Sequence, residues 1–293
     1  MLGRSLIGTL GMVLVVGFAP ADPQRPLAPL PPGGLRVAPF FDGWYANPDA
    51  SITLSFGYSN LNREELVEIP LGPDNFIEPK EFDGRQPTSF PAVVADSGDS
   101  GGRADRRDRA RGVFTIMVPS GFKGDVVWTL RHRGQTYRVP GRSKTGAYQL
   151  RWPMAMGSIP PILRFKPDGP AGRGPAGIQA DPLQASVGAP LSLSIWIADD
   201  SVREKDPIPS KREAKAALNV NWYKHSGPGA VVFNPPKSPI AELKGTASTA
   251  VTFAQPGEYM IRVRADNFGR LDTSPGNQCC WTNGYVKVKV TPS

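Results

Sequence analysis

The 293-residue chain is rich in Gly and Pro, and this composition excludes most helical architectures. Each of the two residues occurs 32 times, which together is nearly twice their usual share of ~12%. Because Pro and Gly break helix interiors, helix bundles and coiled coils are excluded. Hydrophobic residues make up 40% of the chain and aromatic residues 9%, which excludes a wholly disordered protein. We therefore expect an all-β fold, and the length favours about two domains.

The net charge of +8 is unevenly distributed. Arg63–Asp83 holds seven acidic and two basic residues, whereas Arg103–Lys144 holds eleven basic and three acidic residues. These two stretches either face each other or lie in solvent, while a basic groove formed by the second would bind an acidic polymer. We expect a solvated surface and no nucleic-acid partner.

The first 21 residues have the pattern of a cleaved secretory signal peptide. Arg4 and the amino terminus supply positive charge, Ser5–Phe18 is mostly apolar, and Ala19-Pro20-Ala21 is a small-x-small cleavage site. The apolar run is shorter than the about 20 residues of a membrane span. We expect a periplasmic or secreted protein that contacts the membrane only through this transient segment. Residues 22–39 are Pro-rich and should form an extended spacer.

Residues 40–165 are predicted to form a first β-sandwich with a flexible loop at 91–112. Apolar Ile52, Leu54, Phe56 and Tyr58 alternate with small residues, which is the period of a half-buried strand. The segment 95–112 is rich in Ser, Gly, Asp and Arg, and a loop this long is usually disordered or functional. Further strands are expected at Leu66–Leu71, Val113–Val118, Val126–Arg131 and Gln135–Val139.

A second β-sandwich is predicted over residues 181–293. It follows a Pro- and Gly-rich linker at 166–180. Short strands separated by Gly/Pro turns are typical of sandwiches, and only Lys211–Leu218 indicates a helix, of one or two turns. The expected strands are Leu191–Ile197, Leu218–Trp222, Ala230–Phe233, Ala250–Phe253, Tyr259–Arg264 and Tyr285–Val290.

The second half contains a series of motifs in a fixed order: Trp222, Ser226-Gly227-Pro228-Gly229, Phe233, Pro256-Gly257-Glu258-Tyr259 and Ala265-Asp266. Through these motifs the chain from about Val187 to Val290 resembles the polycystic-kidney-disease-type and related immunoglobulin-like repeats of extracellular proteins. The resemblance implies an immunoglobulin-like β-sandwich that serves adhesion, glycan or protein binding, or spacing. This chain departs from the pattern by inserting residues 267–283 before the final strand.

Aromatic residues in both halves are candidates for binding. Exposed, coplanar Trp44 and Tyr45 would favour a carbohydrate ligand, and Trp281 is either an exposed platform for a sugar or partner side chain or a core filler. The first half also resembles uncharacterised exported bacterial proteins through Gly43-Trp44-Tyr45 and Phe56-Gly57-Tyr58. This second resemblance implies no activity.

Cys279 and Cys280 are the two cysteines of the chain, and they are adjacent. In an exported protein disulfides persist. The pair therefore forms a vicinal disulfide within an eight-membered ring, stays as two unbridged thiols, or makes intermolecular links. The ring, if formed, would hold Trp281 in place.

Residues 98–102, Gly-Asp-Ser-Gly-Gly, match the nucleophile signature of trypsin-like serine proteases. In that family the His base precedes the Ser, but His132 and His225 are the two histidines and both follow Ser100. We interpret the match as a coincidence in a Gly/Ser/Asp-rich loop. The chain is therefore not expected to be an enzyme.

No cofactor is expected, because no zinc spacing of Cys or His is present. Ca²⁺ stays possible at the loop ends of the second sandwich if Asp199, Asp200, Asp266 and Asp272 converge. The alternative is that these carboxylates form turns.

These patterns favour an exported bacterial protein that binds a cell-surface glycan or protein through loops at the ends of β-sandwiches, without catalysis. The main alternative is a carbohydrate-active enzyme, or a carbohydrate-binding accessory module, with its site in the first half. A deep cleft with two carboxylates about 5 to 10 Å apart would distinguish the enzyme. A purely structural spacer is the third possibility, and the oligomeric state stays open.

Overall fold

The computed structural model describes residues 33–62, 64–92, 109–142, 146–150, 157–202, 217–267 and 280–293. All of them belong to one compact unit, Pro31–Ser293. Within these ranges the regular elements are strands and short 3₁₀ turns. The predicted all-β fold is confirmed.

The N-terminal half, which comprises the described residues up to Leu150, contains three small sheets. Their strand orders are β1-β2-β6, β4-β7-β8 and β3-β5. The elements are β1 (Val37–Ala46), β2 (Ile52–Asn60), β3 (Val67–Glu68), β4 (Asn75–Glu78), η1 (Lys80–Phe82), β5 (Ser89–Phe90), β6 (Arg109–Val118), β7 (Val126–His132), β8 (Gln135–Gly141) and η3 (Gly146–Tyr148).

Aromatic side chains from both three-stranded sheets fill the core of this half. Phe56 of β2 stacks on Phe114 of β6, with ring centroids 5.3 Å apart, and Trp128 of β7 meets Phe114 edge-on at 5.0 Å. The buried indole Nε1 of Trp128 donates to Oδ1 of Asn75, 3.0 Å away. The alternation that predicted β2 thus places Phe56 on the face packed against β7. The strand is not half-buried as expected, because Thr53, Ser55 and Gly57 on its other face are buried too.

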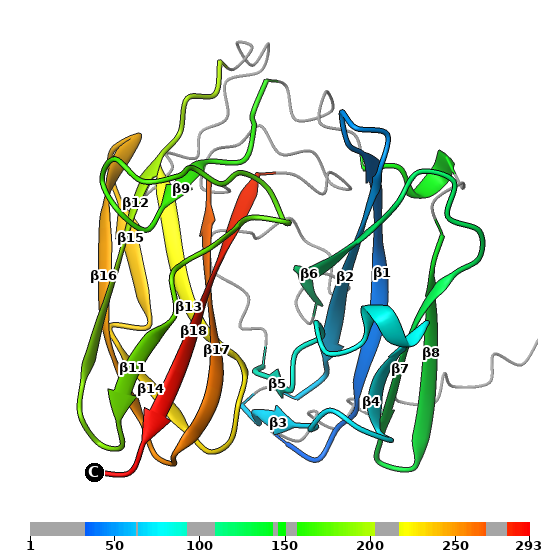
Figure 1. Ribbon diagram of the computed structural model, residues 1–293, viewed down its shortest axis with the longest axis horizontal. Coiled ribbons are helices and arrows are strands. Elements are labelled where there is room, and N and C mark those ends of the chain that lie inside the picture. Colours follow the sequence, from blue (N-terminus) through cyan, green and yellow to red (C-terminus); the bar gives the residue numbers. More distant parts are fainter. Residues whose placement is uncertain are drawn as a thin grey trace, which may run out of the picture. The chain divides into compact units, whose positions relative to one another are not determined.

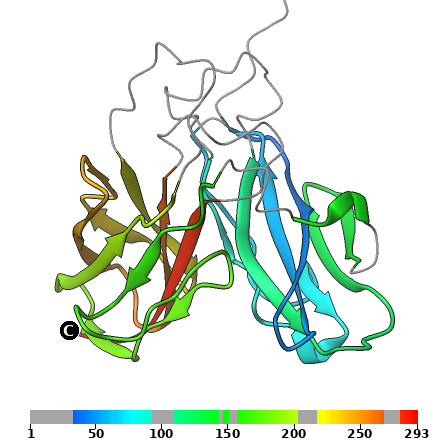
Figure 2. The same cartoon turned by 90° about the horizontal axis from the view of Figure 1, so that it is seen from above.

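The C-terminal half, residues 157 onward, is a sandwich of two larger sheets, which lie face to face in Figures 1 and 2. One sheet has the order β14-β16-β12-β9, and the other β10-β18-β17-β13-β15 with β11 also pairing with β18. The elements are β9 (Ile162–Arg164), β10 (Ile178–Gln179), β11 (Leu183–Ser186), β12 (Leu191–Ala198), β13 (Leu218–Ser226), β14 (Val231–Asn234), β15 (Lys237–Ile240), β16 (Lys244–Phe253), β17 (Gly257–Asp266) and β18 (Trp281–Thr291).

The strand order of this half is that of an immunoglobulin-like sandwich. The first sheet corresponds to immunoglobulin strands A, B, E and D, and the β13-β17-β18 core of the second corresponds to C, F and G. Trp222 of β13 is 3% exposed and packs in one buried cluster with Ile195 of β12 and Val251 of β16. The core Trp expected from the sequence therefore lies between the two sheets.

Several elements differ from their expected bounds. Val37–Pro39 belongs to β1 rather than to the spacer, β9 pairs with β12 although the sequence placed it in the first sandwich, and β10 lies within the expected linker. The strands β9 and β10 are too short for alternation to be visible, and their partners are distant in sequence. The strand expected at Leu66–Leu71 shortens to β3, since Pro70 has no N–H to donate.

Two expected features lie wholly or largely outside the described residues. Of the loop at 91–112, residues 93–108 are outside, and Arg109–Gly112 already belongs to β6. Of the short helix predicted at Lys211–Leu218, residues 211–216 are outside, and Leu218 opens β13.

Candidate functional site

The two halves meet along a polar contact, here called the seam, whose upper end is formed by β6 and the start of β18. The buried Asn283 donates from Nδ2 to the carbonyl oxygens of Gly112 (2.7 Å) and Pro175 (2.9 Å). Tyr285 donates from its hydroxyl to the carbonyl of Val113 at 3.0 Å. The β18 strand is therefore fastened to the N-terminal half by side chains that follow each other at a spacing of two.

Trp281 packs against Gly112 at this upper end. The indole is 2% exposed, and a Cβ at Gly112 would lie 2.1 Å from its Cζ2 atom. Gly112 also has φ +56°, in the region that favours glycine. The structure thus places Trp281 in the interior, between the halves, where only glycine leaves room for it.

Asp42 binds the backbone of Gly112 at its N–H, whereas Asn283 binds it at its carbonyl. Its carboxylate lies at a bulge of β1, next to Gly43, and Oδ2 accepts from the N–H of Gly112 at 2.7 Å and from the hydroxyl of Ser55 at 3.1 Å. Burial raises the pKa of Asp42 to about 6, although the hydrogen bond from Gly112 and the charge of Arg111 oppose this. The carboxyl therefore titrates near neutrality.

Tyr45 and Trp44 do not form one platform. Neighbouring residues of a strand point to opposite faces, and Trp44 packs partly buried against the core of the N-terminal half. Tyr45 forms hydrogen bonds with the side chain of Thr53 and the backbone of Ala176, and burial raises its pKa. Because Ala176 follows Pro175, to which Asn283 donates, Tyr45 reaches the upper end of the seam.

The lower end of the seam joins β13 to the segment that precedes β5. The backbone carbonyl of His225 accepts from the N–H of Thr88 at 2.9 Å, and its ring Nε2 lies 3.0 Å from the carbonyl of Arg85. Next to it, Lys224 Nζ is 2.8 Å from Oε1 of Glu68 in β3. Two consecutive residues of β13 thus bind three separate residues of the N-terminal half.

Arg262 of β17 occupies the seam between these ends. It is 4% exposed, its guanidinium lies 4.5 Å from the ring centroid of Tyr223, and Nη1 is 3.4 Å from Oδ1 of Asn283. Within the described part of the chain no carboxylate lies at ion-pair distance from it. Burial lowers the pKa of Arg262, and burial also raises the pKa of Tyr285 to about 12 and that of Tyr58. The cation is therefore stabilised by the face of Tyr223 and the side-chain amide of Asn283.

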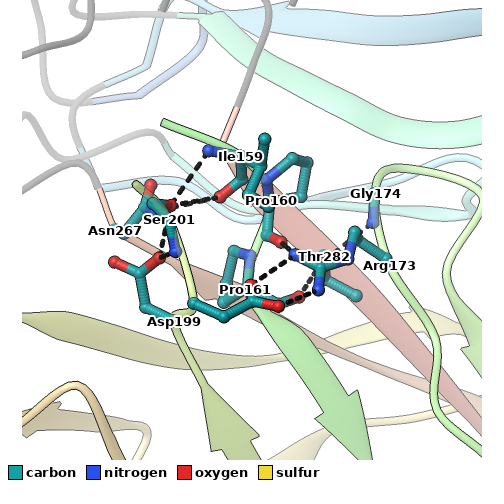
Figure 3. Close-up of polar contacts among 10 residues, drawn as sticks. Ile159, Pro160, Pro161, Arg173, Gly174, Asp199, Ser201, Asn267 and Thr282 are labelled. Atoms are coloured by element: carbon teal, nitrogen blue, oxygen red, sulfur yellow. Dashed lines mark hydrogen bonds and ion pairs between the residues drawn. The ribbon is translucent and has the colours of Figure 1, made fainter. Parts of the chain in front are cut away.

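A second polar group, here called the loop-end cluster, ties together the connections at one end of the C-terminal half (Figure 3). Ser201 exchanges hydrogen bonds with the backbone of Ile159, whose carbonyl also accepts from Asn267 Nδ2 at 3.0 Å. Thr282 Oγ1 accepts from Gly174 N at 2.9 Å and donates to the carbonyl of Pro161 at 2.5 Å. Four connections distant in sequence are thus held together.

Three of the four carboxylates considered for Ca²⁺ have a structural partner. Asp199 accepts from the N–H and the hydroxyl of Ser201, Asp200 forms a two-pronged pair with Arg173, and Asp266 pairs with Arg264. Asp272 lies outside the described residues. Among the described side chains, no group of three or more His, Cys, Asp or Glu could hold a metal ion.

The protease-like motif at 98–102 lies outside the described residues. His132 accepts at Nδ1 from the N–H of Val37, 3.0 Å away, and burial lowers its pKa. His225 lies in the seam, as described above. Both rings thus make structural contacts with backbone groups.

Two residues of the basic stretch pair with residues of the acidic stretch in the N-terminal half. Arg133 pairs with Glu65 at 3.4 Å and Arg138 with Glu78 at 3.1 Å. The four side chains are 33–61% exposed, so these pairs lie at a solvated surface. Residues 103–108 and 143–144 of the basic stretch lie outside the described residues.

A surface depression of about 430 Å³ lies beside β4 and includes two carboxylates. One, Glu78, pairs with Arg138, and the other, Asp83, accepts from Ile77 N and Gln86 Nε2. Both carboxylates therefore hold the local fold together rather than standing free for acid–base chemistry.

Cys280 is buried, has φ +88° and is disulfide-bonded. Cys279 lies outside the described residues, so the eight-membered ring stays a prediction.

Sequence reasoning missed Asp42, Gly112, Asn283 and Arg262. A signal existed for Asp42, which is a charged residue between Phe41 and Gly43 in an otherwise apolar strand, a pattern of bulges. The other three had none, because their role depends on contacts between residues as much as 171 positions apart.

Within the described ranges, no helix has the length and apolar character needed to span a bilayer.

No protein-family model matches the chain, and no curated protein matches it either. Solved structures similar to it include domains 4 and 5 of the S-layer protein SbsC, with 12% identity, TM-score 0.25, 59% of this chain and 69% of that chain covered. The D0-D1 domain of intimin has 10% identity and TM-score 0.24, with 86% and 97% covered. A protein of unknown function from Porphyromonas gingivalis W83 has 10% identity and TM-score 0.24, with 88% and 100% covered. Structural similarities this low do not indicate what the chain does.

Proposed function

We propose that this chain is an exported bacterial binding protein that acts through loop surfaces of its β-sandwiches, without catalysis. Its partner is a glycan or protein of the cell surface, and it works in the periplasm or outside the cell after removal of residues 1–21. The C-terminal sandwich is then a polycystic-kidney-disease-type module used for recognition. The carboxylate contacts described above give no support to the alternative of a carbohydrate-active enzyme.

The loop-end cluster is the observation that carries this proposal. Its hydrogen bonds join the backbone before β9, the connection at Gly174, the end of β12 and the start of β18 into one arrangement. Fixing loops before a partner arrives lowers the entropy lost on binding. Val202, which directly follows Ser201, is 86% exposed, so the chain presents an apolar side chain to solvent next to this cluster.

Binding of the purified exported chain to an immobilised cell-envelope fraction tests the proposal. Val202→Asp should weaken binding at least about tenfold, because a charge would have to be desolvated in the contact. Val232→Asp is the matched control: Val232 is 63% exposed on the edge strand β14, away from the loops, and its variant should bind normally.

Three results would contradict the proposal. Equal effects of the two substitutions would place recognition elsewhere, and release of soluble sugar or peptide from the envelope would make the chain an enzyme. Retention of the first 21 residues in the purified exported chain would contradict the proposed removal of this segment.

A further inference from the structure

His225 is the one histidine among the described residues whose side chain crosses the seam. Its ring is 6% exposed, and Nε2 lies 3.0 Å from the carbonyl oxygen of Arg85. Since a carbonyl accepts only, Nε2 carries the proton and donates. Nδ1 is then without a proton in the neutral ring, and it has no hydrogen-bond partner. A second proton would therefore enter a buried position with no acceptor.

None of the described charged or titratable groups packed around this ring offers a negative charge to a protonated imidazole. Arg262 from β17 is cationic, and Tyr285 from β18 meets the imidazole edge-on at 5.6 Å. On β13 itself, Lys224 is already paired with Glu68. The Arg85 segment offers a carbonyl to the ring, and that carbonyl is occupied by Nε2.

We propose that His225 makes the lower end of the seam acid-sensitive: its protonation opens the contact of β13 with β3 and the segment before β5 while each half stays folded. The backbone bond from Thr88 to the His225 carbonyl breaks with it, because ring and carbonyl belong to one bulged residue of β13. The surfaces of β3, β5 and β13 are then uncovered. This inference does not depend on the proposed binding function.

The size of the effect follows from linkage. Burial, followed by the charge of Arg262, lowers the pKa of His225 to about 4, against 6.5 for the free side chain. The neutral ring favours the closed seam at high pH, and closure is lost as the pH falls through this interval. Opening should become up to about 30-fold more favourable at pH 5 than at pH 8.

Amide hydrogen exchange of the full exported chain, corrected for the intrinsic effect of pH, measures the opening directly. The Thr88 N–H bonds only to His225 across the seam, so its protection should fall about 30-fold from pH 8 to pH 5. Amides within the sandwiches, such as those that pair β12 with β16, should keep their protection.

His225→Gln supplies the decisive comparison. Its amide still donates to the Arg85 carbonyl but does not titrate, so the fall in Thr88 protection should disappear. His132→Gln, a histidine within the N-terminal half, should behave as the wild type. Loss of protection in the sandwiches at the same pH would mean global unfolding and overturn the proposal. A fall that persists in His225→Gln would overturn it too, by assigning the opening to the Lys224–Glu68 pair.

Discussion

The two ends of the seam use opposite chemistry for the same task. At the upper end the buried acid Asp42 positions the Gly112 peptide that Asn283 binds, and at the lower end the buried base His225 binds the Arg85 carbonyl. Burial favours the uncharged form of both groups, since neither faces an opposite charge close enough to compensate. The two groups differ in the pH at which they are uncharged: Asp42 is uncharged at low pH and His225 at high pH.

The signs follow from linkage. Asp42 has a pKa of about 6 in the fold and 3.8 outside it, so its contribution to stability is complete below 3.8 and is lost as the pH rises through 6. His225 has a pKa of about 4 in the fold and 6.5 outside it, so its contribution is complete above 6.5 and is lost as the pH falls through 4. Each amounts to about 3 kcal/mol, and between pH 4 and 6.5 they largely cancel.

Removing the glycine at the upper end should have the largest effect. Gly112→Ala places a methyl group 2.1 Å from the Trp281 ring at positive φ, and we expect a loss of about 3 kcal/mol or more in the free energy of unfolding. Denaturant titration with tryptophan fluorescence measures it. Gly121→Ala is the matched control, with φ +80° but nothing within 4 Å, and should cost only about 1 kcal/mol. Equal losses of stability in the two variants would refute the close contact between Gly112 and Trp281.

Replacing Asp42 by a residue that does not titrate should reveal the pH dependence that His225 contributes to stability. Asp42→Asn keeps an acceptor for Gly112 and Ser55 but does not titrate, so its stability relative to the wild type should rise by up to about 3 kcal/mol from pH 4 to pH 8. The stability of the variant itself should then increase with pH, following His225. Denaturant titrations across this range test both statements, with the exposed Asp74→Asn as control. Parallel curves for Asp42→Asn and wild type would contradict them.

The smallest effect is expected from the ion pair at the lower end. The side chain of Glu68 is 39% exposed, and Lys224, which is 6% exposed, also donates to the carbonyl of Gly229 at 2.6 Å. The cation therefore keeps a partner when the carboxylate is removed, and a half-exposed carboxylate contributes little. Glu68→Gln should lower stability by less than about 1 kcal/mol and leave the pH dependence of Thr88 exchange intact. A loss much larger than this would make the pair, rather than His225, the main contact of that end.

The fold could be predicted from the sequence where apolar residues alternate along a single strand. Tyr259, Ile261 and Val263 alternate in the sequence and lie buried in β17, and Trp222 fills the core as expected. In contrast β9 has three residues and β10 two, which is too few for a period to be visible, so their positions depend on partners found only in the folded chain.

The candidate site was less accessible to sequence reasoning. Trp281 was singled out for its neighbouring cysteines, and the structure places it in the seam. The residue that makes room for it, Gly112, is 169 positions earlier and looked like the end of a loop. Arg262 fits the polar side of an alternating strand, and only the tertiary contact turns that side inward.

The position of β18 in the sheet also has a consequence for biogenesis. This strand is the last along the described chain, yet it pairs with β17, β10 and β11 and its first residues contact β6. Synthesis from the amino terminus delivers residues 281–291 after all of these partners. The surface of β6 at Gly112 therefore stays uncovered until β18 has been made, and a holding chaperone has most to protect during that interval.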